Sequence, residues 1–205
     1  VHLEKVSHDV MVVQLKLPQN QTLQYLPGQY IDILLRDGRR RSFSIANAAA
    51  EGEDLQLHVR RVPDGHFTEQ VFTTMKARDL LRFQGPLGTF FLREEETHPV
   101  IMVGGGTGLA PLKAILDVAL DKFPDREFHL FWGVRSMEDL YLDNEVRGWS
   151  DTHRNLSYTP VLSEPKTEDN WQGETGFVHE VVLRQHPALN DFEVYASGPP
   201  PMIEA

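Results

Sequence analysis

The chain has 205 residues, 40% of them hydrophobic, so it can bury one large core or two smaller ones. Its formal net charge of −10 argues against nucleic acid or an anionic membrane surface as a general partner. No apolar run approaches the roughly 20 residues that span a bilayer, and the first residues lack a signal-peptide pattern. The absence of cysteine excludes disulfides, thiolate catalysis and cysteine-ligated iron–sulfur clusters within the chain. We expect the cytoplasm as the default location.

The first half has the pattern of short strands separated by turn residues. Strands are predicted at 11–17, 30–35, 41–46, 55–60 and 80–83, with one short helix at 67–75. The dipeptide Asp37-Gly38 is a strong hairpin signal. Many short strands at close spacing predict a closed or nearly closed antiparallel β-barrel. We interpret Gln84–Gly88 as a turn between strands.

The second half alternates strands with helices. Strands are predicted at 100–103, 128–132, 156–162 and 192–196, and helices at 109–120, 137–147 and 178–184. The continuously apolar run Val100–Val103 is typical of a parallel strand buried on both faces. The alternation predicts a doubly wound parallel α/β domain.

The charged stretch at 94–99 separates the two patterns, so we expect one domain at 1–96 and a second at 97–205. The final residues open a helix that then stops, and the chain does not begin with Met. We therefore expect a truncated C-terminus and a chain that is part of a longer protein.

A glycine-rich loop joins the strand at 100–103 to the helix at 109–120. Backbone N–H groups and the helix dipole at such a helix start can bind a phosphate, and glycine permits close approach or positive φ. Leu109 excludes both the Walker loop and the GxGxxG dinucleotide motif. A glycine turn without a ligand is the alternative, but the strand–loop–helix context favours a nucleotide. The residues concerned are Gly104, Gly106, Thr107, Gly108 and Pro111.

Three consecutive arginines precede a strand rich in hydroxyl groups. We interpret Arg39 and Arg40 as a solvated hairpin end. Arg41 differs, because the strand can present Arg41 to a phosphate, Phe43 to a flat ring and the Ser44 hydroxyl to a ring nitrogen.

A second segment, 58–68, runs from a strand into the start of a helix. That start is either an anion site or an ordinary capped helix, and the segment alone favours neither.

Together these segments resemble the ferredoxin–NADP reductase superfamily, in the family's order and over nearly the whole chain. The resemblance is strongest to the reductases with an N-terminal plant-type [2Fe–2S] domain, which include CDP-6-deoxy-Δ3,4-glucoseen reductase and the reductases of bacterial oxygenases. It implies a Greek-key FAD-binding β-barrel followed by an NAD(P)-binding α/β domain. The motifs are Arg41-x-Phe43-Ser44, Gly65-x-x-Thr68, Gly104-x-Gly106-x-Gly108-x-x-Pro111 and Ser197-Gly198-Pro199-Pro200-Pro201-Met202.

The resemblance also implies residue roles on the flavin side. Arg41 would bind a flavin phosphate, Phe43 would lie against the flavin, and Ser44 would sit near the flavin N5 atom, which accepts hydride. The family more often has Tyr at the position of Phe43, so stacking survives without a phenolic hydrogen bond. The residues implied for the adenine or pyrophosphate side are His58, Val59, Arg60, Gly65 and Thr68.

On the nicotinamide side, the resemblance implies that the glycine loop, Gly198 and Pro199 hold the dinucleotide. Ser197, where the family commonly has Cys, would pack beside the nicotinamide and act with Ser44 in catalysis. Glu164 would repel a 2′-phosphate and accept from a ribose hydroxyl, which favours NADH. Arg135 and Lys166 keep NADPH possible.

Three functions remain open. The first is an FAD-dependent reductase that passes electrons one at a time to a [2Fe–2S] domain or ferredoxin-like protein outside this chain. The second is an NAD(P)H:flavin reductase that releases reduced flavin, and the third is a binding module without activity. We expect no metal site, because the remaining histidines are scattered, at His8, His66, His98, His129, His153 and His186.

Overall fold

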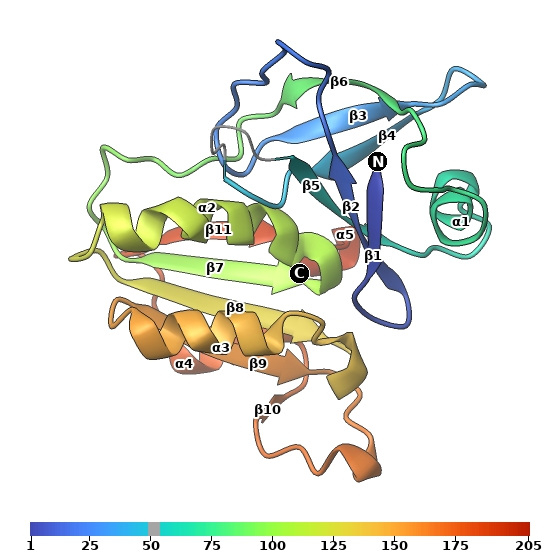
Figure 1. The fold of residues 1–205 in the computed structure, drawn as a ribbon. Helices are drawn as coiled ribbons and strands as arrows, with labels where there is room; N and C mark the ends of the chain where they lie inside the picture. Colours follow the sequence, from blue (N-terminus) through green and yellow to red (C-terminus); the bar gives the residue numbers. More distant parts are fainter. Residues whose placement is uncertain (49–53) are drawn as a thin grey trace.

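The computed structural model describes residues 1–48 and 54–205. Its N-terminal half contains two three-stranded antiparallel sheets (Figure 1). One sheet has the order β1-β2-β5, and the other has the order β4-β3-β6. The strands are β1 (His2–Lys5), β2 (Val10–Leu15), β3 (Tyr30–Leu34), β4 (Arg40–Ser44), β5 (Leu55–Arg60) and β6 (Arg82–Leu87), with helix α1 (His66–Thr73) after β5.

The two antiparallel sheets share one apolar core. Ile31 and Ile33 of β3 and Leu57 of β5 are fully buried, and an isolated bridge between Ile45 and Leu57 joins the sheets. Helix α1 adds Phe67 to the same core. The predicted antiparallel β fold is therefore confirmed.

Two features of this half differ from the sequence prediction. Strand β1 was not predicted, because three of its four residues are exposed and it shows no apolar alternation. The interpretation of Gln84–Gly88 as a turn is wrong, since β6 continues to Leu87 and pairs Gln84 with Asp32 of β3. Glycine at position 85 lets β6 pack closely against β3, because a Cβ there would lie 2.5 Å from the Cγ2 atom of Ile31.

The C-terminal half contains a five-stranded parallel sheet with the order β10-β9-β8-β7-β11 (Figure 1). Helices α2 and α3 pack on one face of the sheet and α4 packs on the other. The elements are β7 (Val100–Gly105), α2 (Leu109–Lys122), β8 (Phe128–Val134), α3 (Asp143–Thr152), β9 (Leu156–Leu162), β10 (Glu174–Thr175), α4 (Val178–Gln185), β11 (Glu193–Ser197) and α5 (Pro200–Ile203). This confirms the predicted doubly wound domain.

No described helix is both long and apolar enough to cross a membrane.

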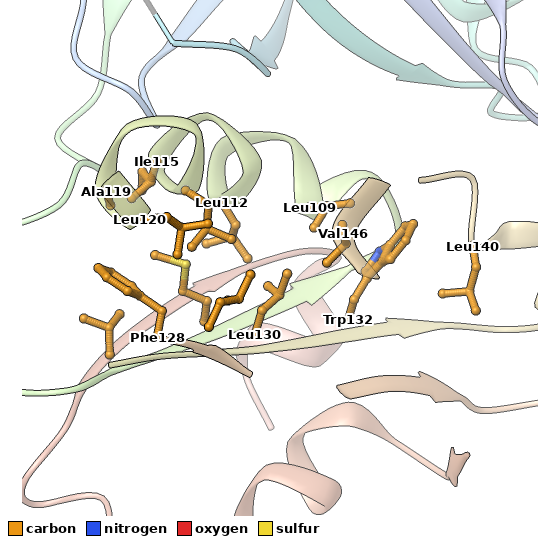
Figure 2. Close-up of a cluster of buried hydrophobic side chains, with 14 of the residues drawn as sticks. Leu109, Leu112, Ile115, Ala119, Leu120, Phe128, Leu130, Trp132, Leu140 and Val146 are labelled. Atoms are coloured by element: carbon orange, nitrogen blue, oxygen red, sulfur yellow. The ribbon is translucent and has the colours of Figure 1, made fainter. Parts of the chain in front are cut away.

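Strand β7 is buried on both faces, which explains its continuous apolar run. Val100 and Met102 belong to the cluster beneath α2, whereas Ile101 and Val103 belong to the cluster beneath α4. Burying each such side chain contributes about 1.5–3 kcal/mol. Figure 2 shows the first cluster, in which apolar side chains of α2 face those of β8.

The single helix predicted at 137–147 is wrong. A 3₁₀ turn, η2 (Met137–Asp139), ends before α3 begins at Asp143. The Asp139 carboxylate accepts hydrogen bonds from both the backbone and the hydroxyl of Ser136, a capping box that begins the turn, and the turn ends at Leu140, where φ is −79° and ψ is 60°. Leu140 after the turn is buried in the core beneath α2, and Tyr141 packs against that core. This break carries Asp139 and Tyr141 to the surface that faces the barrel.

Candidate functional site

A cleft of about 1330 Å³ lies between the barrel and the carboxyl ends of the parallel strands. Strand order reverses between β7 and β11, and such a switch point is where open α/β sheets bind ligands. Both halves of the chain line the cleft. Its lining includes these residues predicted from the sequence: Arg41, Phe43, Ser44, His58, Arg60, Gly65, Thr68, Gly106, Thr107, Gly108, Arg135, Ser197, Gly198 and Pro199.

Five predicted residues lie outside the lining: Val59, Gly104, Pro111, Glu164 and Lys166. Val59 is fully buried in the barrel core, because side chains alternate along β5 and the lining residues His58 and Arg60 lie on the opposite face of the strand. Gly104 packs against α2, since a Cβ at this position would lie 3.3 Å from the side chain of Leu112. Pro111 is buried in the first turn of α2.

The three consecutive arginines have different surroundings. Arg39 pairs with Asp37 at 2.7 Å, and Arg40 lies 4.0 Å from Asp32. The Arg41 guanidinium donates to the backbone carbonyl of Arg40 at 2.7 Å, and it has no carboxylate partner among the described residues. Arg41 lines the cleft, so its charge is available to an anion such as a phosphate.

Phe43 and Ser44 end β4 at the cleft. The Phe43 ring contacts Phe67 of α1 with centroids 5.4 Å apart and a tilt of 50°, which fixes the ring beside the cleft. Within 1–48 and 54–205, the Ser44 hydroxyl has no hydrogen-bond partner. The strand therefore presents an aromatic ring and an available hydroxyl side by side.

The loop before α1 is closed by Thr68. The Thr68 hydroxyl accepts from the Val62 N–H at 3.1 Å and lies 3.0 Å from the Gly65 carbonyl, to which it can donate. A Cβ at Gly65 would lie 2.5 Å from this hydroxyl, so only glycine fits there. Thr68 thus shapes the loop that lines this side of the cleft.

The glycine loop is built against the end of β11. A Cβ at Gly108 would lie 2.0 Å from the Ser197 carbonyl, and a Cβ at Gly105 would lie 2.9 Å from Pro199. These two glycines are required by packing, independently of any ligand. Gly106 has φ +55°, the left-handed conformation that glycine adopts at least cost. The loop and the segment 197–199 therefore form one surface at the start of α2.

A buried contact connects the two halves beside the cleft. The Nδ1 atom of His58 lies 2.9 Å from the hydroxyl of Tyr141, and the two rings meet edge to face. Burial, with a smaller effect of the Lys113 charge, lowers the pKa of His58 to about 3, so its imidazole is neutral near pH 7. Burial also raises the pKa of Tyr141, which keeps the phenol protonated.

A charged cluster lies next to this contact. Arg60 donates to Asp9 at 2.6 Å, and its guanidinium lies 4.0 Å from Asp139 of the other half. The His8 ring lies 3.8 Å from both carboxylates, so His8 belongs to a cluster that sequence reasoning missed. The ligand atoms of His8, Asp9 and Asp139 lie within 4.8 Å of one another, but the Arg60 guanidinium already supplies positive charge there.

The residues considered for nicotinamide preference follow β8 and β9. Arg135 and Ser163 line the cleft, and the N–H of Glu164 donates to the Arg135 carbonyl at 2.8 Å. The Lys166 ammonium donates to Glu138 at 2.6 Å. The positive charge of Lys166 is therefore already paired.

Comparison with known proteins identifies both halves of the chain. Residues 1–92 match the family described as "Oxidoreductase FAD-binding domain", and residues 102–205 match "Oxidoreductase NAD-binding domain". The chain is 42% identical over 205 residues to the CDP-6-deoxy-L-threo-D-glycero-4-hexulose-3-dehydrase reductase of Yersinia pseudotuberculosis, covering 99% of this chain and 60% of that protein. It is 33% identical to the anthranilate 1,2-dioxygenase electron transfer component of Acinetobacter baylyi, covering 99% and 59%.

The fold matches solved structures of similar proteins. A cytochrome P450 reductase from Amycolatopsis superposes with a TM-score of 0.91 at 34% identity, covering 100% of this chain and 61% of that one. The chain spans about 60% of the length of the curated relatives that it matches. It carries an FAD-binding and an NAD-binding oxidoreductase domain, and it belongs to the ferredoxin reductase family.

Proposed function

We propose that this chain takes hydride from NADH at the cleft and passes electrons, one at a time, to a [2Fe–2S] domain or ferredoxin-like protein outside it. The observation that carries the proposal is the shared cleft, which the Arg41–Ser44 strand lines from one side and the glycine loop from the other. In this assignment residues 1–96 form the FAD-binding domain and residues 97–205 the NAD-binding domain. The proposed location is the cytoplasm, where NADH is regenerated.

The residues of the cleft fit FAD and a nicotinamide dinucleotide. Arg41 supplies a guanidinium without a competing carboxylate among the described residues, and Phe43 supplies a ring fixed by Phe67. When bound there, FAD accepts hydride from the nicotinamide and can release the two electrons singly. The Ser44 and Ser197 hydroxyls line the cleft from opposite domains, where each would contact the reacting rings.

The chain's own contribution to the reaction is placement. The glycine loop and the segment 197–199 hold the dinucleotide, while β4 and the Thr68 loop hold the flavin. Bringing two reactants to about 3–3.5 Å in the right orientation supplies much of the rate enhancement in such transfers. No side chain is required to act as a strong acid or base.

NADH is the preferred donor in this proposal. Glu164 follows β9, where a carboxylate repels a 2′-phosphate and accepts from a ribose hydroxyl. Lys166 would otherwise attract a phosphate, but Glu138 neutralises it at 2.6 Å. Of the two cations that keep NADPH possible, Arg135 lines the cleft and Lys166 does not.

The electron acceptor lies outside the residues of this chain. The chain has no cysteine to ligate a plant-type cluster. The relatives are named as a dehydrase reductase, an electron transfer component and, in Ralstonia, a ferredoxin–NAD(P)(+) reductase component of a dioxygenase system. A protein-borne [2Fe–2S] centre is the acceptor that these names favour.

The test is electron delivery by the purified protein. We expect FAD to co-purify, NADH to reduce the protein faster than NADPH, and each NADH to reduce two molecules of an added oxidised [2Fe–2S] ferredoxin. A colourless protein that turns over only with added flavin would instead identify a flavin reductase. A protein that binds neither FAD nor NADH would reject both activities.

A further inference from the structure

The outward face of β5 contacts the nucleotide-binding half through His58 and Arg60. His58 and Arg60 project from the barrel toward the segment 136–141. The His58 Nδ1 atom lies 2.9 Å from the Tyr141 hydroxyl, and the Arg60 guanidinium lies 4.0 Å from Asp139. This segment directly follows β8, so its position is tied to the carboxyl edge of the parallel sheet.

A series of contacts continues from Tyr141 to the glycine loop. The Tyr141 ring meets Trp132 edge to face, with centroids 5.3 Å apart. The Trp132 indole N–H donates to the Gly106 carbonyl at 2.9 Å, and Trp132 is fully buried. Gly106, the loop residue with positive φ, is therefore connected to His58 of the FAD-binding barrel through the rings of Trp132 and Tyr141.

The hydrogen bond at the centre of this series is buried and uncharged. Desolvation keeps the His58 imidazole neutral and the Tyr141 phenol protonated near pH 7. Lys113, whose charge also acts on His58, is itself paired with Asp117 at 3.2 Å. A neutral buried bond is not screened by salt, so it gives the two domains a fixed relation under working conditions.

We propose that His58 and Tyr141 are positioning residues, which hold the glycine loop, and the nicotinamide bound to it, at a set distance from the flavin strand. This inference rests on the proposed function. His58 lines the cleft, but its Nδ1 atom bonds Tyr141, and Tyr141 contacts Trp132, whose indole N–H bonds the carbonyl of Gly106. Their effect on hydride transfer is through geometry, where a displacement of about 1 Å can cost on the order of a hundredfold in rate.

Tyr141→Phe tests the proposal, because it removes the hydroxyl and keeps the ring against Trp132. We expect the limiting rate of flavin reduction by NADH, measured by anaerobic stopped flow, to fall about ten- to hundredfold. The Kd for NADH should change by less than about threefold, since binding contacts remain. Amide hydrogen exchange, measured without NADH, should become faster in residues 56–60 and 104–109.

Two further variants separate positioning from loss of stability. Tyr158→Phe removes a comparable hydroxyl, bonded to Asp143 at 2.9 Å within the same domain and outside the cleft lining, and should leave rate and exchange unchanged. His58→Asn keeps a polar atom near the Nδ1 position, so it should recover most of the rate that His58→Phe loses.

The proposal is wrong if Tyr141→Phe and Tyr158→Phe match in limiting rate and in exchange of the loop. It is also wrong if Tyr141→Phe changes only the Kd for NADH. If NADH does not reduce the wild-type protein at all, the proposed function fails. Unchanged exchange at 104–109 in Tyr141→Phe would then overturn the positioning role as well.

Discussion

The three consecutive arginines at 39–41 differ in the groups that surround their guanidinium charges. Two of the three guanidinium groups have carboxylate neighbours, Asp37 and Asp32, whereas Arg41 faces the cleft. A side chain whose charge is already compensated has less to gain from a ligand phosphate. Of these three arginines, Arg41 is therefore the one that we propose binds the flavin phosphate.

Arg41→Ala should weaken FAD binding about ten- to hundredfold, because a hydrogen bond to a charged group contributes about 1.5–3 kcal/mol. The matched control is Arg39→Ala, which removes the same charge two residues away and should leave the Kd within about twofold. Titration of apoprotein with FAD, followed by flavin fluorescence, measures both. If both variants weakened FAD binding equally, the net charge of the protein, and not a contact of Arg41, would account for the effect.

The buried imidazole of His58 makes stability depend on pH. In the folded state its pKa is lowered to about 3 by burial and by Lys113, so below its ordinary pKa the unfolded chain binds a proton that the folded chain does not. The free energy of unfolding should therefore fall, as pH drops from about 6.5 toward 3, by about 1.4 kcal/mol per unit from this group.

Urea unfolding of wild type and His58→Gln at pH 7, 6, 5 and 4 measures this effect. The variant is expected to be less stable at pH 7 but to lose less stability on acidification. His66→Gln, which changes an exposed histidine, should keep the slope of the wild type. Parallel curves for wild type and His58→Gln would show that His58 is not buried in its neutral form.

At the scale of elements, the strands and helices were predictable wherever one periodicity covered the whole segment. Strand β9 matches its predicted range, and the run at 100–103 indicated a strand buried on both faces. The helix predicted at 137–147 failed because the backbone leaves helical geometry at Leu140, with φ −79° and ψ 60°, which ends the short turn that the Ser136–Asp139 capping box begins. Strand β10 has two residues, too few for any periodic signal.

The glycine loop shows why an element and its neighbour must be considered together. The sequence indicated glycines that leave room for a ligand, but Gly108 leaves room for the Ser197 carbonyl, 89 positions away in the chain. That clash involves backbone on both sides, so no rotamer change relieves it. The loop and β11 are therefore one structural unit.

Gly108→Ala should lower the free energy of unfolding by about 1–3 kcal/mol through overpacking, and should also weaken NADH binding. Gly148→Ala is the control, because a Cβ there meets nothing within 4 Å in the middle of α3. That change should raise stability by about 0.5–1 kcal/mol. Urea unfolding compares them, and a neutral Gly108→Ala would contradict the packing account.

At the scale of the whole molecule, the site is the surface where two domains meet. Motifs in the sequence indicated many of the residues that line the cleft within each domain, since those residues follow local strand and helix ends. The residues that contact each other across the domain interface gave no signal in the sequence that they are partners. Tyr141 is 83 positions from His58, and Asp139 is reached from Arg60 only through the tertiary fold. Such contacts depend on how the domains pack, which no spacing rule describes.

Domain packing also decides whether the two cofactor sites act as one. Arg41, Phe43 and Ser44 belong to the barrel, whereas Gly106, Thr107, Gly108 and Ser197 belong to the α/β domain, and all seven line the same cleft. Hydride transfer requires that both rings reach this common space. The central claim is therefore that a nicotinamide bound by one domain reduces a flavin bound by the other.

The most direct test is an anaerobic titration of the FAD-loaded protein with NADH, followed by the visible absorbance of the flavin. The account predicts that one equivalent of NADH per bound FAD bleaches the flavin completely, and that an added oxidised [2Fe–2S] protein restores the colour. Bound flavin that stays oxidised in excess NADH would contradict it.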